Sequence, residues 1–225
     1  MSKLKSEGVD KAASDKPRVR DRIFDTASEL FYRHGIRAVG VDAIASEAGT
    51  NKMSFYRSFP SKDDLVAEYL CGQQREYWQW WDEVVAPHQG DPRRQIEALI
   101  ESTIDLARLK AKTAEGCRTA RGCALGNAAV EIPEDNERLG DIVHNYKSEI
   151  RRRLRALAAE AGARDADALG DALMLLLEGG LYTRLTFPDN TGPIASITQA
   201  AGWLLDACTK PGCTAGSAKQ PSGRA

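Results

Sequence analysis

Long apolar runs are missing from this chain of 225 residues, and so is an apolar segment near its N-terminus. The longest apolar run, LMLLL at 173–177, is far shorter than the roughly 20 residues that a helix needs to cross a bilayer. The opening residues MSKLKSEGVDKAASDK lack the apolar core of a secretory signal. We therefore expect a cytoplasmic protein without a membrane partner.

Cysteine and histidine are scarce, with five and three residues. An odd, scattered set of cysteines excludes a complete intramolecular disulfide framework and favours a reducing compartment. Cys117 and Cys123 lie in one irregular segment, but no neighbouring histidine completes a tetrahedral metal site. We expect no metal and no other cofactor. We interpret the spacing of the two cysteines as coincidental, the alternative being a thiol switch.

The sequence also lacks an excess of charge of either sign and any recognisable catalytic motif. Its 31 basic and 32 acidic side chains give a net charge of −1, which excludes a uniformly basic nucleic-acid wrapper but not a local basic patch. We find no nucleophile elbow, phosphate-binding loop, dinucleotide fingerprint or H-x-x-x-H pair. We therefore expect no enzymatic activity. The alternative function from another class is a cytosolic thiol-based sensor or helical enzyme that uses Cys117 and Cys123.

What the sequence does contain is apolar residues at helical spacing, without a segment that alternates like a strand. The pattern predicts an all-α protein whose first three helices form a separate N-terminal domain. Both ends, 1–15 and 210–225, are polar or rich in Gly, Ser and Pro, and we expect them to be disordered. The expected helices span 16–34, 41–48, 52–58, 62–85, 92–112, 124–131, 134–161, 165–186 and 194–209.

The two short helices between Val41 and Ser58 are joined by a Gly49 turn, which makes them a helix-turn-helix candidate. The segment 49–62 contains three cations and no acidic residue, so positive charge gathers where a DNA groove would be met. Phe55 and Phe59 are expected to anchor the second helix, while Tyr56 faces outward. The charge alone is equally compatible with an ordinary solvated face, but its combination with the turn favours DNA binding.

The segment GIRAVGVDAIASEAGTNKMSFYRSFPSKDDLV resembles the DNA-binding domain of the TetR family of bacterial transcriptional regulators, over about residues 19–69. The resemblance implies a DNA-binding domain at 16–62 and a helical ligand-binding and dimerisation domain at 63–209. It also implies a homodimeric repressor that leaves a palindromic double-stranded DNA operator when a small-molecule effector binds. The implied base-reading residues are Lys52, Met53 and Ser54, and the implied phosphate contacts are Val41, Tyr56, Arg57 and Lys62.

Two positions depart from the family pattern. Val41 stands where the family often has Thr or Ser, so only a backbone N–H could meet a phosphate there. Met53 stands where many members have a small residue, and its side chain could touch a thymine methyl but cannot hydrogen-bond a base.

An aromatic cluster follows in REYWQWWDEV, where Tyr77, Trp78 and Trp81 share a helix face. A packed core or a seam between domains is the preferred interpretation, and the wall of a ligand pocket is the alternative. In the second case, polar groups near the cluster would come from Arg118, Arg121, Asn127 and Glu131.

The last two expected helices carry apolar stripes too broad for one neighbour within the chain. Two such helices from each of two copies can form a four-helix bundle about a two-fold axis. Gly180 suggests a close approach of helices there, the alternative being flexibility beside a pocket. The expected interface comprises Leu173, Leu176, Leu177, Gly180, Ile197, Ala201 and Leu204.

Overall fold

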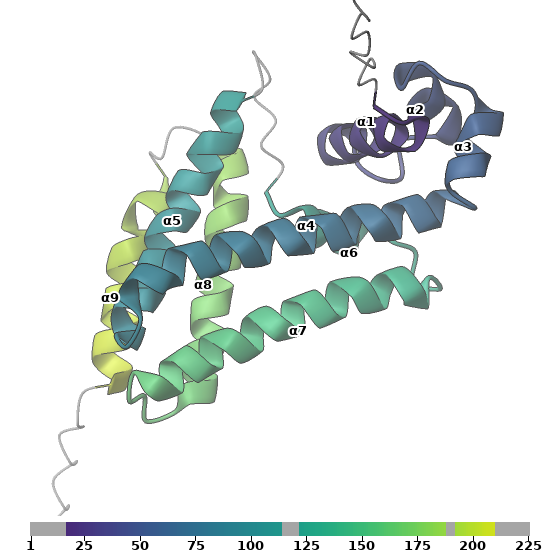
Figure 1. Ribbon diagram of the computed structural model, residues 1–225. Helices are drawn as coiled ribbons and strands as arrows, with labels where there is room; N and C mark the ends of the chain where they lie inside the picture. Colours follow the sequence, from purple (N-terminus) through teal and green to yellow (C-terminus); the bar gives the residue numbers. More distant parts are fainter. Residues whose placement is uncertain (1–16, 114–121, 188–191, 210–225) are drawn as a thin grey trace, which may run out of the picture.

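The computed structural model describes residues 17–113, 122–187 and 192–209 (Figure 1). These residues form helices and connecting turns without a strand, which confirms the predicted all-α class. No helix among them is long and apolar enough to span a membrane. The α-helices are α1 (Val19–His34), α2 (Val41–Glu47), α3 (Lys52–Ser58), α4 (Lys62–Val85), α5 (Pro92–Thr113), α6 (Ala124–Glu131), α7 (Glu137–Glu160), α8 (Ala166–Thr186) and α9 (Ile197–Thr209), with 3₁₀ turns η1 (Ala86–His88) and η2 (Pro193–Ser196).

Side-chain caps explain where several helices begin. Asn51 Oδ1 accepts the Ser54 N–H at the start of α3, as expected from the sequence. Ser61 Oγ likewise accepts the Asp64 N–H at the start of α4, at 3.0 Å. The Asp64 carboxylate accepts a hydrogen bond from the Ser61 hydroxyl, which departs from the backbone contact of a full capping box.

Three helices begin three residues later than the apolar period suggests, and the first of them is α1, expected from residue 16 and observed from Val19. The helix expected from residue 134 starts at Glu137, because Asn136 Oδ1 accepts the Leu139 N–H and so caps the helix there. The helix expected from residue 194 starts at Ile197, because Pro193–Ser196 form a 3₁₀ turn that opens with a proline.

Helices α1–α3 pack at one end of the molecule around a core shared with the first turns of α4 (Figure 1). Phe31 of α1 and Tyr69 of α4 have ring centroids 5.5 Å apart, and both side chains are buried. The packing of α1 therefore extends beyond residue 62, where we expected the first domain to end. Helix α4 then continues away from α1–α3 into the rest of the molecule, so it connects the two regions mechanically.

The larger region is built around α7 and α8, which make the most extensive pairing of helices among the described residues. Gly170 permits this approach, because a Cβ at that position would lie 2.7 Å from the Arg155 backbone. Arg151 and Arg155 both pair with Asp171 across the two helices, and these contacts hold the pKa of Asp171 well below the ordinary aspartate value.

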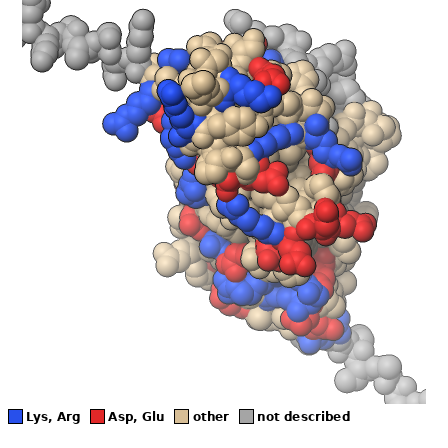
Figure 2. All heavy atoms as spheres, turned by 90° about the vertical axis from the view of Figure 1, so that its right-hand side faces the viewer, with Lys and Arg blue, Asp and Glu red and all other residues tan. Residues whose placement is uncertain are grey.

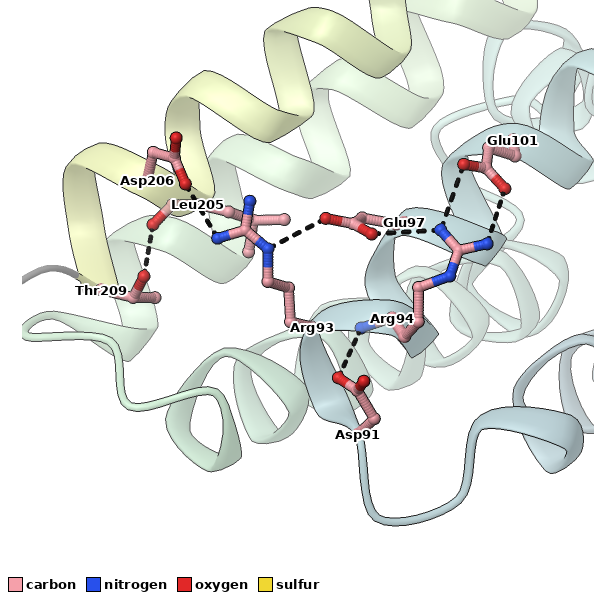
Figure 3. Close-up of polar contacts among 8 residues, drawn as sticks. All are labelled: Asp91, Arg93, Arg94, Glu97, Glu101, Leu205, Asp206 and Thr209. Carbon is pink, nitrogen blue, oxygen red and sulfur yellow. Dashed lines mark hydrogen bonds and ion pairs between the residues drawn. The ribbon is translucent and has the colours of Figure 1, made fainter.

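A polar network ties the first turns of α5 to α9 (Figure 3). Arg93 donates to Asp206 of α9 at 2.9 Å and to Glu97 of its own helix at 3.0 Å. Arg94 donates to both carboxylate oxygens of Glu101, each at 3.2 Å. Because these groups are partly exposed, the network fixes the position of α9 more than it adds stability.

Candidate nucleic-acid interface

The turn between α2 and α3 has the backbone geometry that a helix-turn-helix unit needs. Gly49 adopts φ +62°, a left-handed conformation that glycine tolerates without strain. The Thr50 N–H donates to the Ala45 carbonyl at 2.8 Å and closes the turn. The Asn51 cap then starts α3 in a new direction, so this short connection fixes α3 relative to α2.

The inner face of α3 is fully anchored. Phe55 and Phe59 are 0% and 2% exposed and pack with Ile44 of α2 in the common core. The guanidinium of Arg20 in α1 lies 4.6 Å from the centre of the Phe59 ring and pairs with Glu68 of α4. These contacts connect α3 to its neighbours, so its outer face is held on a rigid support.

The outer face of α3 presents the side chains expected to meet DNA. Lys52, Met53, Tyr56 and Arg57 are all exposed, with Met53 at 66% and Tyr56 at 49%, while Ser54 is half-buried. Arg57 Nη2 lies 3.4 Å from the Met53 sulfur, one turn away. Figure 2 shows Lys and Arg side chains gathered over the upper part of this end of the molecule, where α1–α3 lie, and acidic groups mixed with them lower down.

The other two expected phosphate contacts differ in their surroundings. Val41 begins α2 and packs partly against the core, and the residue before it, Gly40, has no side chain to cap the helix. Lys62 Nζ donates to the Ile36 carbonyl at 2.6 Å and lies 6.0 Å from the centre of the Phe31 ring. Burial lowers the pKa of Lys62 below the ordinary lysine value. The Ile36 carbonyl uses one of the three donors of this ammonium.

One residue of this surface was missed by the sequence analysis. Asp42, in the first turn of α2, has its Oδ2 atom 3.2 Å from Lys52 Nζ at the start of α3. Asp42 precedes the segment 49–62, so the absence of acidic residues from that segment does not mean that its cations lack an acidic neighbour. The signal was available, because the packing of α2 against α3 brings together residues ten positions apart.

The aromatic cluster lies in a seam between α4 and α7. Ring centroids of Tyr77 and Trp78 are 5.2 and 5.8 Å from that of Tyr146 in α7, and Trp81 is 3% exposed. The Arg153 guanidinium covers the Trp78 ring at 4.2 Å. Burial raises the pKa values of Tyr77 and Tyr146 well above the ordinary tyrosine value. These are contacts of a packed core within the larger region, not of a seam between the two expected domains.

Asn127 and Glu131, which we had grouped with the aromatic cluster, belong to α6 and face α1. They line a small cavity together with Phe31 and Tyr32 of α1. Glu131 Oε2 accepts the backbone N–H of Arg37 at 3.1 Å. The other two polar residues proposed for the pocket, Arg118 and Arg121, lie outside the described residues.

The contact of α6 with the α1–α2 connection depends on a glycine. Gly35 adopts φ +92° and ψ 154°, a conformation that is essentially restricted to glycine. A Cβ at this position would lie 2.6 Å from Glu131 Oε1. The carboxylate therefore occupies the space that any other residue would fill.

Cys123 is the N-cap of α6. Its sulfur accepts the Gly126 N–H at 3.4 Å and lies 3.7 Å from Lys147 Nζ, which also pairs with Glu178 of α8 at 2.6 Å. Cys117, the other half of the alternative thiol switch, lies outside the described residues. Within the described ranges, no group of three or more His, Cys, Asp or Glu side chains is arranged to hold a metal ion.

The structure places much of the expected dimer interface inside the chain. Leu173, Leu177, Ile197 and Ala201 are at most 6% exposed and pack in the core of the single chain, which leaves little of their surface for a partner. A Cβ at Gly180 would lie 2.5 Å from the Ile197 side chain, so this glycine permits the approach of α8 to α9 in one chain. An apolar stripe in the sequence does not reveal whether its neighbour is in the same chain.

Another part of the surface of α8 and α9 is exposed. Leu175 and Trp203 are 74% and 64% exposed, and Leu176 and Leu204 are half-buried. A groove of about 330 Å³ lies between α8 and η2–α9, with Leu175 and Gly179 among its lining residues. A Cβ at Gly179 would meet nothing within 4 Å, in contrast to its neighbour in the sequence.

Comparisons with known proteins agree with this architecture. The sequence profile described as "Bacterial regulatory proteins, tetR family" matches residues 23–69. The uncharacterized HTH-type transcriptional regulator YxaF of Bacillus subtilis (strain 168) is 30% identical over 187 residues, which are 80% of this chain and 91% of that protein. The HTH-type transcriptional repressor KstR2 of Rhodococcus jostii (strain RHA1) is 35% identical over 92 residues, or 41% of this chain and 45% of the repressor.

The similarity in structure extends over both regions. The crystal structure of SCO4454, a TetR-family transcriptional regulator from Streptomyces coelicolor, matches with a TM-score of 0.76 and 26% identity, covering 88% of this chain and 94% of that chain. Three findings agree: the profile match at residues 23–69, the similarity to YxaF over most of its length, and the structural similarity to SCO4454. The chain belongs to the TetR family of bacterial transcriptional regulators.

Proposed function

We propose that this regulator is a homodimeric repressor that binds a palindromic double-stranded DNA operator and is released by a small-molecule effector. The observation that carries the DNA-binding part is the outer face of α3, where Met53 and Tyr56 are exposed above the buried Phe55 and Phe59. A short rigid helix with an exposed polar face fits the major groove of B-form DNA. We expect it to act in the cytoplasm, as a regulator and without catalysis.

The exposed side chains divide into two roles on DNA. Lys52, Met53 and Ser54, in the first turn of α3, are proposed to meet base edges, because recognition helices contact bases through their N-terminal residues. Lys can donate to guanine and the Met53 methyl can pack on a thymine methyl. The proposed phosphate contacts are the Tyr56 hydroxyl, the Arg57 guanidinium, Lys62 and the α2 backbone at Val41.

A dimer would present two copies of α3 to a two-fold symmetric site. The proposed interface uses the open surface of α8 and α9 around Leu175, Gly179 and Trp203. Exposed large apolar side chains on two adjacent helices favour burial against an identical surface, and two helices from each copy make a four-helix bundle. Gly179→Leu should weaken the dimer through overpacking of this surface. Gly180→Leu should instead disturb the packing of α8 and α9 within each chain.

Helix α6 is the proposed link between effector and DNA. Its N-terminal end contacts α7 through Cys123 and Lys147, and its C-terminal end holds the α1–α2 connection through Glu131. A ligand that prefers a different arrangement of α7 and α8 would shift α6, and this shift would reposition α3.

The test is a selection of DNA duplexes from a randomised pool by the full-length protein, followed by sedimentation of the protein alone and with the selected duplex. We expect a palindromic consensus and two protein chains per duplex. Gly179→Leu should lower both self-association and operator affinity. Gly140→Leu in α7 is the control, because Gly140 has no positive φ and an added Cβ there would meet nothing within 4 Å. Selection of no consensus, or tight binding by a monomer, would contradict the proposal.

A further inference from the structure

An exposed carboxylate of α2 lies beside the first cationic side chain of α3. Asp42 Oδ2 lies 3.2 Å from Lys52 Nζ, and the two side chains are 77% and 57% exposed. Because both are exposed, their pairing adds little to the stability of the fold. The ion pair instead affects which groups on DNA Lys52 can contact.

A lysine ammonium has three donors, and Asp42 uses one of them. Lys52 can therefore donate to the O6 and N7 atoms of a guanine while its contact with Asp42 is kept. A phosphate contact is different, because it would bring an anion close to the Asp42 carboxylate, whereas the edge of a guanine carries no net charge. The ion pair thus disfavours the phosphate contact of Lys52 relative to its base contact.

We propose that Asp42 is a specificity-determining residue, which positions Lys52 for a base edge and lowers the affinity of the protein for DNA without the operator sequence. This inference rests on the proposed DNA-binding function. Asp42 acts through Lys52 and is a positioning residue. Its carboxylate reduces the sequence-independent attraction to phosphates, which dominates non-specific binding.

The experiment compares Asp42→Asn with wild type on two duplexes of equal length. One duplex is the consensus selected by the wild-type protein, and the other has a scrambled sequence. Dissociation constants are measured between about 50 and 200 mM salt. Glu47→Gln is the matched control, because it removes an exposed negative charge from the other end of α2.

We expect Asp42→Asn to bind the scrambled duplex about three- to tenfold more tightly, and to steepen its slope of log K against log salt by about 0.9, the value for one added phosphate contact. Affinity for the consensus should rise less, so the specificity ratio falls. Asp42→Glu should keep the wild-type ratio. In a Lys52→Met background, Asp42→Asn should tighten binding to the scrambled duplex no more than Glu47→Gln does.

Two results would overturn the inference. One is an Asp42→Asn protein whose specificity ratio and salt slope equal those of the Glu47→Gln protein. That result would mean that only the net charge of the surface matters. The other is an effect of Asp42→Asn that persists without Lys52. Failure of the wild-type protein to select any consensus would refute the proposed function itself, and this inference with it.

Discussion

The contact between Gly35 and Glu131 predicts a measurable coupling between residues 96 positions apart in the sequence. Substitution of Gly35 by alanine has two separable costs. The first is the backbone conformation at φ +92° and ψ 154°, which costs a residue with a Cβ about 1–3 kcal/mol. The second arises because the new Cβ would lie 2.6 Å from Glu131 Oε1.

The carboxylate is the end of a flexible side chain, so it can move away, but it then loses the Arg37 N–H. A net contribution of about 0.5–1.5 kcal/mol is reasonable for this partly exposed hydrogen bond. Gly35→Ala should therefore cost about this much less in a Glu131→Ala background, where the bond is already absent. The backbone cost remains in both backgrounds.

The assay is thermal unfolding of the four proteins of this double-mutant cycle, in which each kcal/mol corresponds to about 2–4 °C for a chain of this size. Gly49→Ala is the control, since Gly49 also has a positive φ but an added Cβ would meet nothing within 4 Å. Its cost should be equal in the two Glu131 backgrounds. An equal cost of Gly35→Ala in both backgrounds would refute the reasoning.

Three further predictions concern other parts of the molecule. Tyr56→Phe should weaken binding to consensus and scrambled duplexes by the same factor in salt titrations, because a phosphate contact carries no sequence information. Trp81→Ala should destabilise the protein by about 3–5 kcal/mol in urea unfolding, since the side chain is 3% exposed in the aromatic seam. Asp171 has a lowered pKa, so its stabilisation is present above the unfolded-state pKa of about 4 and is lost as the pH falls below it. Asp171→Asn should thus flatten the dependence of Tm on pH below about 4, and an unchanged profile would contradict this assignment.

Much of the helical framework could be predicted from local signals. Asn51 and Ser61 mark the starts of α3 and α4 through their caps, and Gly49 marks the turn before α3. These signals act over a few residues, so a single sequence contains all the information that they require. The exposed face of α3 follows from the same reasoning, because buried Phe55 and Phe59 leave one side of a short helix for solvent.

Contacts between distant segments could not be predicted in this way. Leu173 and Leu175 are alike in the sequence, yet one is fully buried and the other is 74% exposed. Gly179 and Gly180 are adjacent, and only the second is enclosed by its own chain. Which residue faces inward depends on how α9 packs on α8, and apolar spacing gives only the period of a helix and not the identity of its neighbour.

The magnitude of the Glu131 contact also limits how α6 can transmit a signal. Coupling between an effector and DNA is typically worth about 1–3 kcal/mol, and one partly exposed hydrogen bond reaches only the lower end of that range. A second connection is present, since the Tyr32 hydroxyl of α1 donates to the Gly122 carbonyl just before α6, at 3.4 Å. Because these contacts hold the α1–α2 connection and α1 from opposite ends of α6, a displacement of the helix should strain or break both. The coupling between the two regions should therefore exceed what either contact provides alone.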